Sequence, residues 1–259
     1  MTIGRWMTLG VLLVLGLAPA GDVARFDTEP VPEPPTDPHV LVLRLREWRS
    51  LTPPEELAAL PAFALYGGGR VIVSAPAAGA LHQGREFTLS PARYRRVHLA
   101  AHRAGLARSA RLRTPAVMTD GWSLIVTLWS GDRHHTTEVG SPGSWDTGRR
   151  QRVASFRKYV MALAGRSTVY QPERLAVLPT FSGSGAESPR RWRWANPRYG
   201  ADTWFGACTV ISRPTMDAVM SEARLASPAT PWHDGGEPLH LVFRPMLPHE
   251  RDCDDLDQP

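Results

Sequence analysis

Long apolar runs, lysine and cysteine are all scarce in this sequence of 259 residues. No segment holds about 18 consecutive apolar residues, the length that a membrane-spanning helix needs, so no transmembrane segment is expected in the mature chain. Neither of the 2 cysteines stands in a C-x-x-C motif, which argues against a metal or redox site of that type. Apolar residues still make up 42% of the chain and charged residues 21%, a balance typical of a folded globular protein.

The basic residues are almost all arginine. Lys158 is the only lysine among 30 basic residues, and with 25 acidic residues the formal net charge is +5. Arginine in place of lysine, beside abundant Ala, Gly and Pro, is typical of a high-GC genome. A nucleic-acid surface needs basic residues concentrated on one face, and along this chain they are mixed with acids, so no nucleic-acid partner is expected. Attraction to anionic envelope polymers or lipid head groups fits the charge at least as well.

The first 20 residues have the pattern of a signal peptide. Arg5 supplies the positive charge, residues 7–17 form a short apolar run, and Ala18-Pro19-Ala20 has the A-x-A form of a cleavage site. The apolar run is shorter than the roughly 20 residues that span a bilayer, so cleavage is favoured over retention as a membrane anchor. We therefore expect a secreted protein, or one on the extracellular side of the cell envelope. Residues 21–38, rich in proline and acids, are expected to form a flexible linker.

Cys208 and Cys253 are predicted to form a disulfide, because an even number of cysteines in an exported chain favours pairing. The alternatives are a cysteine nucleophile or a metal site, and a free thiol outside the cytoplasm tends to be oxidised.

Strand patterns alternate with helix patterns along the chain. Residues 62–66 and 70–74 are β-prone runs around Gly67, Gly68 and Gly69, which predicts a β-hairpin. A phosphate-binding loop would need a helix directly after the glycines, and Val71-Ile72-Val73 follows instead. Further strands are expected at residues 40–46, 86–89, 123–129, 133–139, 175–178, 208–211 and 239–243.

Three helices are predicted. The first follows Ser90 as N-cap and ends at Gly105, the second covers residues 147–163, and the third starts at Pro214. The expected fold class is α+β, with antiparallel sheet built from hairpins and about three packed helices. The folded domain is expected at residues 39–253 in two lobes, 39–165 and 166–253, followed by a disordered tail at 254–259.

Several of these stretches resemble a group of uncharacterised exported proteins from high-GC actinobacteria. Residues 61–73 (PAFALYGGGRVIV) are similar to the group's P-x-F-x-L-Y-G-D-G-x-V hairpin, with Gly68 where the group usually has Asp. Residues 52–55 (TPPE) and 241–250 (LVFRPMLPHE), together with Cys253, also fit. The resemblance implies export and one folded unit over most of residues 40–253. It implies no chemistry, because the group has no assigned activity.

Two pairs of histidines are the weak metal candidates. His98 and His102 are four residues apart on a predicted helix, so their rings share one face, but Leu99 stands where an H-E-x-x-H zinc site has its glutamate. His134 and His135 lie in a predicted strand and point to opposite faces. Semi-buried or surface histidines are the preferred interpretation, no cofactor is expected, and a composite site of both pairs stays open.

No catalytic residue is identified from motifs. Ser155 and Lys158 fit the S-x-x-K of penicillin-recognising enzymes, but they fall in the middle of a helix and no K-T-G is present. Residues 183–185 (GSG) lack the frame of a nucleophile elbow.

The richest aromatic stretch covers residues 190–205 (RRWRWANPRYGADTWF). Its functional interpretation is a ligand-binding surface patch for glycans, anionic polymers or a partner protein, made of Arg190, Trp192, Trp194, Tyr199 and Trp204. The favoured alternative is that the tryptophans pack in the core while the arginines face water. The sequence thus predicts a non-catalytic binding or structural module at the envelope, whose partner is an envelope polymer or envelope protein. The alternative is a hydrolase of envelope polymers, assisted by a metal at the histidines.

Overall fold

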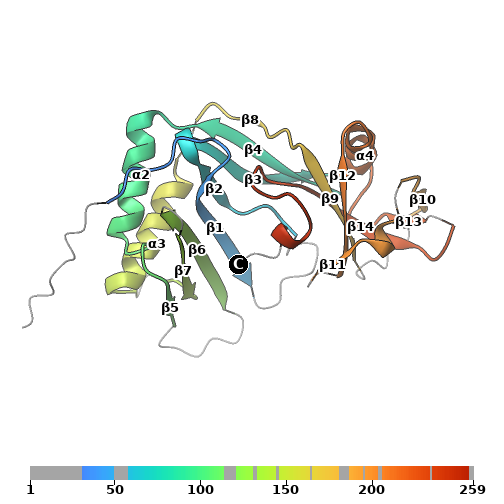
Figure 1. The fold of residues 1–259 in the computed structure, drawn as a ribbon. Coiled ribbons are helices and arrows are strands. Elements are labelled where there is room, and N and C mark those ends of the chain that lie inside the picture. Colours follow the sequence, from blue (N-terminus) through green and yellow to red (C-terminus); the bar gives the residue numbers. More distant parts are fainter. Residues whose placement is uncertain are drawn as a thin grey trace, which may run out of the picture. The chain divides into compact units, whose positions relative to one another are not determined.

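The computed structural model describes residues 31–49, 58–113, 121–130, 133–143, 146–163, 165–180, 187–194, 196–203, 206–233 and 235–256. The predicted signal peptide at 1–20 and the first part of the linker predicted at 21–38 lie outside the described residues. The described part contains three α-helices and one sheet of 14 strands (Figure 1). No helix in it is long and apolar enough to cross a membrane.

The first half of the described chain supplies seven strands, which are β1 (Leu41–Arg49), β2 (Phe63–Tyr66), β3 (Arg70–Ala78), β4 (Leu81–Thr88), β5 (Ala110–Leu112), β6 (Trp122–Ser130) and β7 (Arg133–Gly140). The second half supplies β8 (Thr168–Val169), β9 (Arg174–Thr180), β10 (Arg190–Arg191), β11 (Ala201–Thr203), β12 (Gly206–Ser212), β13 (Pro231–His233) and β14 (Leu239–Pro245). The strand order is β11-β12-β9-β14-β4-β3-β2-β1-β6-β7-β5, with β8 beside β4 and β13 between β14 and β10. The two predicted lobes therefore share a single sheet.

The sheet is mixed, which corrects the expectation of a purely antiparallel one. The predicted hairpins β2/β3 and β6/β7 are antiparallel, as short turns require. Three other pairings are parallel, namely β5/β7, β10/β13 and β4/β14. Each of these joins strands that are separated by other elements, so no hairpin fixes their relative direction.

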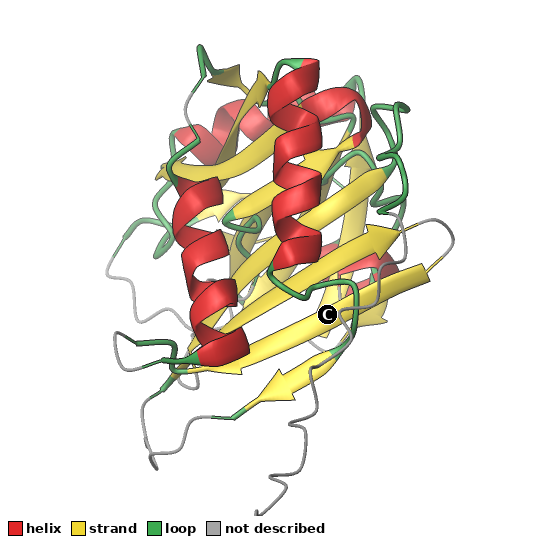
Figure 2. Ribbon diagram, turned by 90° about the vertical axis from the view of Figure 1, so that its left-hand side faces the viewer, coloured by secondary structure: helices red, strands yellow, loops and turns green. Residues whose placement is uncertain are grey.

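Two of the helices cover the first half of the sheet and the third covers the second half. Helix α2 (Pro91–Arg103) and helix α3 (Gly148–Met161) lie side by side on one face (Figure 2). Helix α4 (Thr215–Arg224) packs against the second half. All three helices fall where the sequence predicts them, and Ser90 caps α2 by accepting a hydrogen bond from the backbone N–H of Arg93.

The apolar side chains of these helices build two main clusters. The first joins Val97 and Ala101 of α2 and Val153 of α3 to the sheet residues of β1–β7. The second joins Met216 and Val219 of α4 to residues of β9, β12, β13 and β14. Apolar burial of this extent is the main source of stability in both halves.

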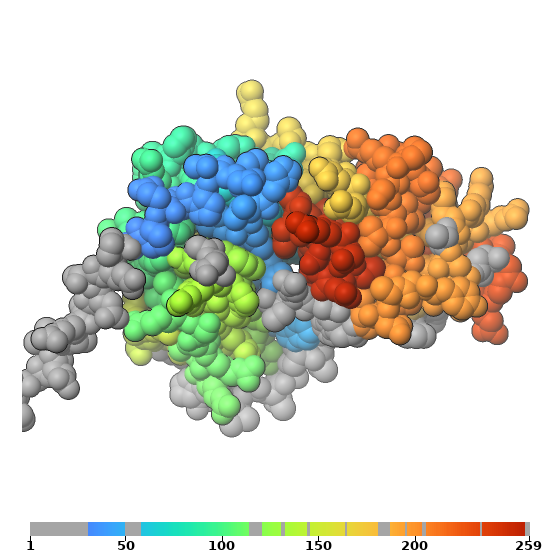
Figure 3. All heavy atoms as spheres, viewed as in Figure 1, coloured from blue at the N-terminus to red at the C-terminus, as the bar shows by residue number. Residues whose placement is uncertain are grey.

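The residues after β14, 246–256, form a C-terminal segment that covers the face of the sheet opposite to α2 and α3. Leu247 packs with Tyr66 of β2 and Tyr170, and Leu256 packs with Val242 of β14. In Figure 3 this segment, red, lies between the blue N-terminal residues and the orange residues of the second half. Because both faces are covered, all four residues of β2 are buried.

The glycines of the predicted hairpin form the turn that the sequence indicates. Gly68 and Gly69 have φ of 66° and 86°, a region that residues with a side chain rarely adopt. A Cβ on Gly67 would lie 2.0 Å from the backbone oxygen of Asp37, so the chain before β1 can approach only a glycine here.

Both ends of the folded part extend further than predicted. Pro35, inside the predicted flexible linker, accepts hydrogen bonds from the Tyr94 hydroxyl at 2.6 Å and from the backbone N–H of Gly68 at 3.2 Å. Asp254–Leu256, inside the predicted disordered tail at 254–259, forms a 3₁₀ helix with Leu256 buried. In both cases a few contacts to the folded part hold a segment whose composition is that of a linker or a tail.

Candidate functional site

The predicted aromatic patch is split between core and surface. Trp192 is only 3% exposed, and its ring contacts those of Trp232 and Phe243 inside the second cluster. Trp194 is half-buried against the same cluster, with its ring centroid 4.8 Å from that of Trp192. The interpretation of Trp192 as a surface residue is therefore wrong, because its apolar area is better buried than left in water.

The remaining members of the patch do not form a shared platform. Arg190 is held by Glu222 at 3.1 Å and by the backbone oxygen of Leu225 at 2.8 Å. Tyr199 is 85% exposed at the end of a 3₁₀ helix. Trp204 lies outside the described residues. Within the described part, Tyr199 is thus the one aromatic member of the patch that is open to solvent.

The histidine pair on α2 is a packed pair. His98 is buried, and its ring centroid lies 4.7 Å from that of His102. Burial lowers the pKa of His98 to about 4, with a smaller contribution from His102. Burial also lowers the pKa of His102, and His135 of β7 adds to this effect. Both rings are therefore neutral at pH 7.

The buried His98 predicts a loss of stability in mild acid. Its pKa is lower in the folded state than in the unfolded chain, so protons bind preferentially to the unfolded chain and stability falls as the pH drops below about 6.5. Between pH 7 and pH 5, we expect the free energy of unfolding to fall by about 2 kcal/mol through this group. Urea unfolding across this pH range measures it. His98→Gln should remove most of this decrease in the free energy of unfolding. His39→Gln, at an exposed position, should show the same decrease as the unchanged protein. An equal dependence of stability on pH in all three proteins would contradict the assignment of the decrease to His98.

The structure describes some of the residues that the hydrolase alternative invoked. The described residues contain no group of three His, Cys, Asp or Glu side chains arranged to hold a metal ion. Ser155 and Lys158 are both exposed on the outer face of α3, so neither is desolvated as an activated nucleophile or base requires. Residues 183–185 lie outside the described part.

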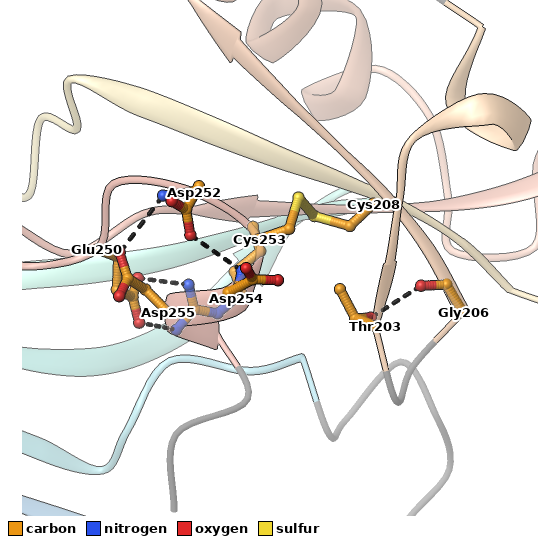
Figure 4. Close-up of a disulfide and its surroundings, with 9 residues drawn as sticks. Thr203, Gly206, Cys208, Glu250, Asp252, Cys253, Asp254 and Asp255 are labelled. Atoms are coloured by element: carbon orange, nitrogen blue, oxygen red, sulfur yellow. Dashed lines mark hydrogen bonds and ion pairs between the residues drawn. A yellow bond between two sulfur atoms is a disulfide. The ribbon is translucent and has the colours of Figure 1, made fainter.

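The two cysteines form the predicted disulfide. Cys208 of β12 and Cys253 of the C-terminal segment are both buried, with Cα atoms 6.0 Å apart (Figure 4). Three residues before Cys253, Glu250 accepts hydrogen bonds from both terminal nitrogens of Arg244, at 2.6 and 2.8 Å, and from the backbone N–H of Leu247. This arrangement holds the C-terminal segment on the sheet, and we assign it a structural role.

The charges are unevenly distributed along the chain, which the total numbers of basic and acidic residues do not show. Residues 87–119 and 147–172 carry 13 basic residues and no acidic residue. The rest of the chain, with 17 basic and 25 acidic residues, therefore has a net charge of −8. The expectation that arginines are evenly mixed with acids is thus wrong for these two segments, which contain α2 and α3 together with their flanking residues.

Some of these cations hold the two helices in place. Near the start of α3, Arg149 donates to the backbone oxygen of Gly105, just beyond the end of α2, at 2.6 Å. Arg150 binds the carboxylate of Asp146 at 2.7 Å and the backbone oxygen of Leu112 at 2.6 Å. These bonds tie the beginning of α3 to the end of α2 and to β5.

Other cations of α2 and α3 face outward. Helices α2 and α3 carry five of them at exposed positions, and none has a carboxylate partner among the described residues: Arg93, Arg96, Arg103, Arg152 and Lys158. Like charges also lie close together in this region. The pKa of Arg149 is lowered mainly by burial and further by the positive charges of Arg108 and Arg152. We call α2 and α3 with these five side chains the cationic layer.

Helix stability does not account for this distribution. The first turns of α2 and α3 contain no acidic residue, although acidic side chains stabilise the positive end of the helix dipole. Arg93, in the first turn of α2, and Arg149, in that of α3, carry the opposite sign. Local conflicts of this kind are concentrated at functional sites.

A groove of about 360 Å³ runs between the two helices of the cationic layer. Its apolar lining is Ala100 of α2, Ala104 at the C-cap of that helix, and Phe156 and Tyr159 of α3. Ala104 and Phe156 are buried, so they form its floor. One arginine from each helix, Arg103 and Arg152, also lines it.

Comparisons with protein-family models, with curated proteins and with solved structures found no match to this chain. Functional inference therefore rests on the physical features of the cationic layer. The signal for it was present in the sequence, as two windows without a single acid, but an average over the chain hides it. The groove could not be read from the sequence, because it depends on how two helices that are 44 residues apart come together.

Proposed function

We propose that the protein works outside the cytoplasm as a non-catalytic binding module, secreted or held at the cell envelope, and that the cationic layer binds an anionic partner there. The observation that carries the proposal is the concentration, on two neighbouring helices, of exposed arginines that have no carboxylate partner within the described part of the chain. Surface charge of one sign raises the local concentration of partners with the opposite sign and speeds their association. The signal peptide pattern supports export, and the disulfide between Cys208 and Cys253 is compatible with an oxidising exterior.

The proposal predicts that binding depends on the position of the charges and not only on their number. A variant with Arg96, Arg152 and Lys158 changed to Glu alters three exposed positions of the cationic layer. Its affinity for poly-L-glutamate at low ionic strength should fall at least tenfold, because attraction becomes repulsion over one face. Fluorescence anisotropy with labelled polymer measures the change.

The matched control carries the same charge change elsewhere. Arg191, Arg193 and Arg251 are also exposed and lie in the second half of the chain, and their change to Glu should lower affinity less than threefold. Equal losses in the two variants would show that net charge alone governs binding. Absence of binding by the unchanged protein at low salt would refute the proposal itself.

A further inference from the structure

The groove between α2 and α3 contains more than charge, and this points to the kind of partner. Its apolar lining places two small side chains, Ala100 and the C-cap residue Ala104, four residues apart at the end of α2. Small side chains let a second backbone approach closely, and the aromatic rings of Phe156 and Tyr159 supply the larger contact area on α3. The lining of α3 from Gln151 to Tyr159 extends over about 12 Å, or roughly two turns.

The charges on the groove come from both helices. Arg103 belongs to α2 and Arg152 to α3, and neither has a carboxylate partner among the described residues. A ligand in the groove would thus meet a guanidinium from each of the two helices. Guanidinium groups form their strongest hydrogen bonds with carboxylates and phosphates.

We infer that this groove receives an acidic amphipathic helix from a partner protein. The inference rests on the proposed function and specifies its partner. A helix with an apolar stripe covers the apolar lining, and glutamates beside the stripe pair with Arg103 and Arg152. Recognition of a helix in a groove uses this combination of apolar anchors and flanking charges.

Other anionic occupants use only part of the site. A flexible polyanion would pair with the arginines and leave the apolar lining in water. A membrane surface would require large apolar side chains that project from the helices, and among the described residues of α2 and α3 only Met161 is a large hydrophobic residue that is well exposed. The helical partner is the occupant that uses both the lining and the charges.

The test compares three labelled probes at 50 mM salt. The first is an 18-residue peptide with Leu and Ala at positions i, i+3, i+4 and i+7 and Glu at the flanking positions. The second has the same composition in scrambled order, and the third is poly-L-glutamate. The unchanged protein should bind the amphipathic peptide at least tenfold more tightly than the scrambled one.

Variants of the groove then locate the binding. Ser155 is an exposed lining residue, and Ser155→Trp should fill the groove and abolish the tenfold preference, with poly-L-glutamate binding changed less than twofold. Gln151→Trp, at a second exposed lining position, repeats the test if the first variant does not fold. Ala92→Trp, exposed on α2 outside the groove, should keep the preference.

A charge exchange supplies an independent readout. The double variant Arg103→Glu, Arg152→Glu should prefer a peptide in which Lys replaces each Glu. Equal binding of the ordered and scrambled peptides, with poly-L-glutamate still bound, would overturn the inference and leave the proposed function standing. Failure of all three probes to bind would remove both.

Discussion

Replacement of Glu250 by glutamine should lower the free energy of unfolding by about 3–5 kcal/mol, because it leaves a buried arginine without its counter-charge. Arg244 and Glu250 are 5% and 2% exposed at their side chains and are joined by two hydrogen bonds. Glutamine keeps the shape of glutamate, so the loss reports the charge and not a cavity. Arg44, also buried, lies close enough to Glu250 to interact with it.

The pH dependence of the same pair has a definite sign. Burial raises the pKa of Glu250, but the charge and hydrogen bonds of Arg244, together with His249 and the backbone N–H of Leu247, lower it more, so the pKa in the folded protein is below its usual value of 4.5. The contribution of the pair is therefore complete above about pH 4.5 and is lost as the pH falls through the lower, folded-state value.

Urea unfolding at pH 7 measures the effect of Glu250→Gln. The matched control is Glu222→Gln, which breaks the half-exposed pair with Arg190 and should change stability by less than about 1 kcal/mol. A similar small change in both variants would contradict the assignment of Glu250 as a buried structural anion.

Removal of the disulfide should produce the second large loss. The bond between Cys208 and Cys253 closes a loop with a sequence separation of 45, which the chain-entropy description values at about 4 kcal/mol. The variant with both cysteines changed to serine should unfold at a lower urea concentration than the oxidised protein. Because both cysteines are buried, the polar hydroxyls add to the loss.

Reduction provides the control for this prediction. Dithiothreitol should shift the unfolding midpoint of the unchanged protein towards that of the serine variant and should have no effect on the variant. An unchanged midpoint for the protein under reducing conditions would show that the crosslink does not limit the unfolded chain.

Elements with strong local patterns were predictable from the sequence. The apolar spacing of Tyr94, Val97 and Ala101 defines α2, and that of Met216 and Val219 defines α4. The short strands β5, β8, β10, β11 and β13 were missed, because two or three residues carry no periodicity. The parallel pairing of β4 with β14 was missed as well, since it joins segments more than 150 residues apart, and no local signal encodes that contact.

The candidate site shows the same division between local and distant information. The pairing of Cys208 with Cys253 followed from the count of cysteines. The burial of Trp192 depends on Trp232 and Phe243, which come from other strands, so alternation with arginines alone could not decide between core and surface. The cationic layer needed only a count of acids in windows, while its groove needed the packing of α2 against α3.

The position of β14 bears on how the sheet is assembled. This strand, at residues Leu239–Pro245, lies between β9 and β4 and so joins the second half of the sheet to the first. The two halves of the sheet therefore gain their main connection only when residues 239–245 take their place between the two neighbouring strands.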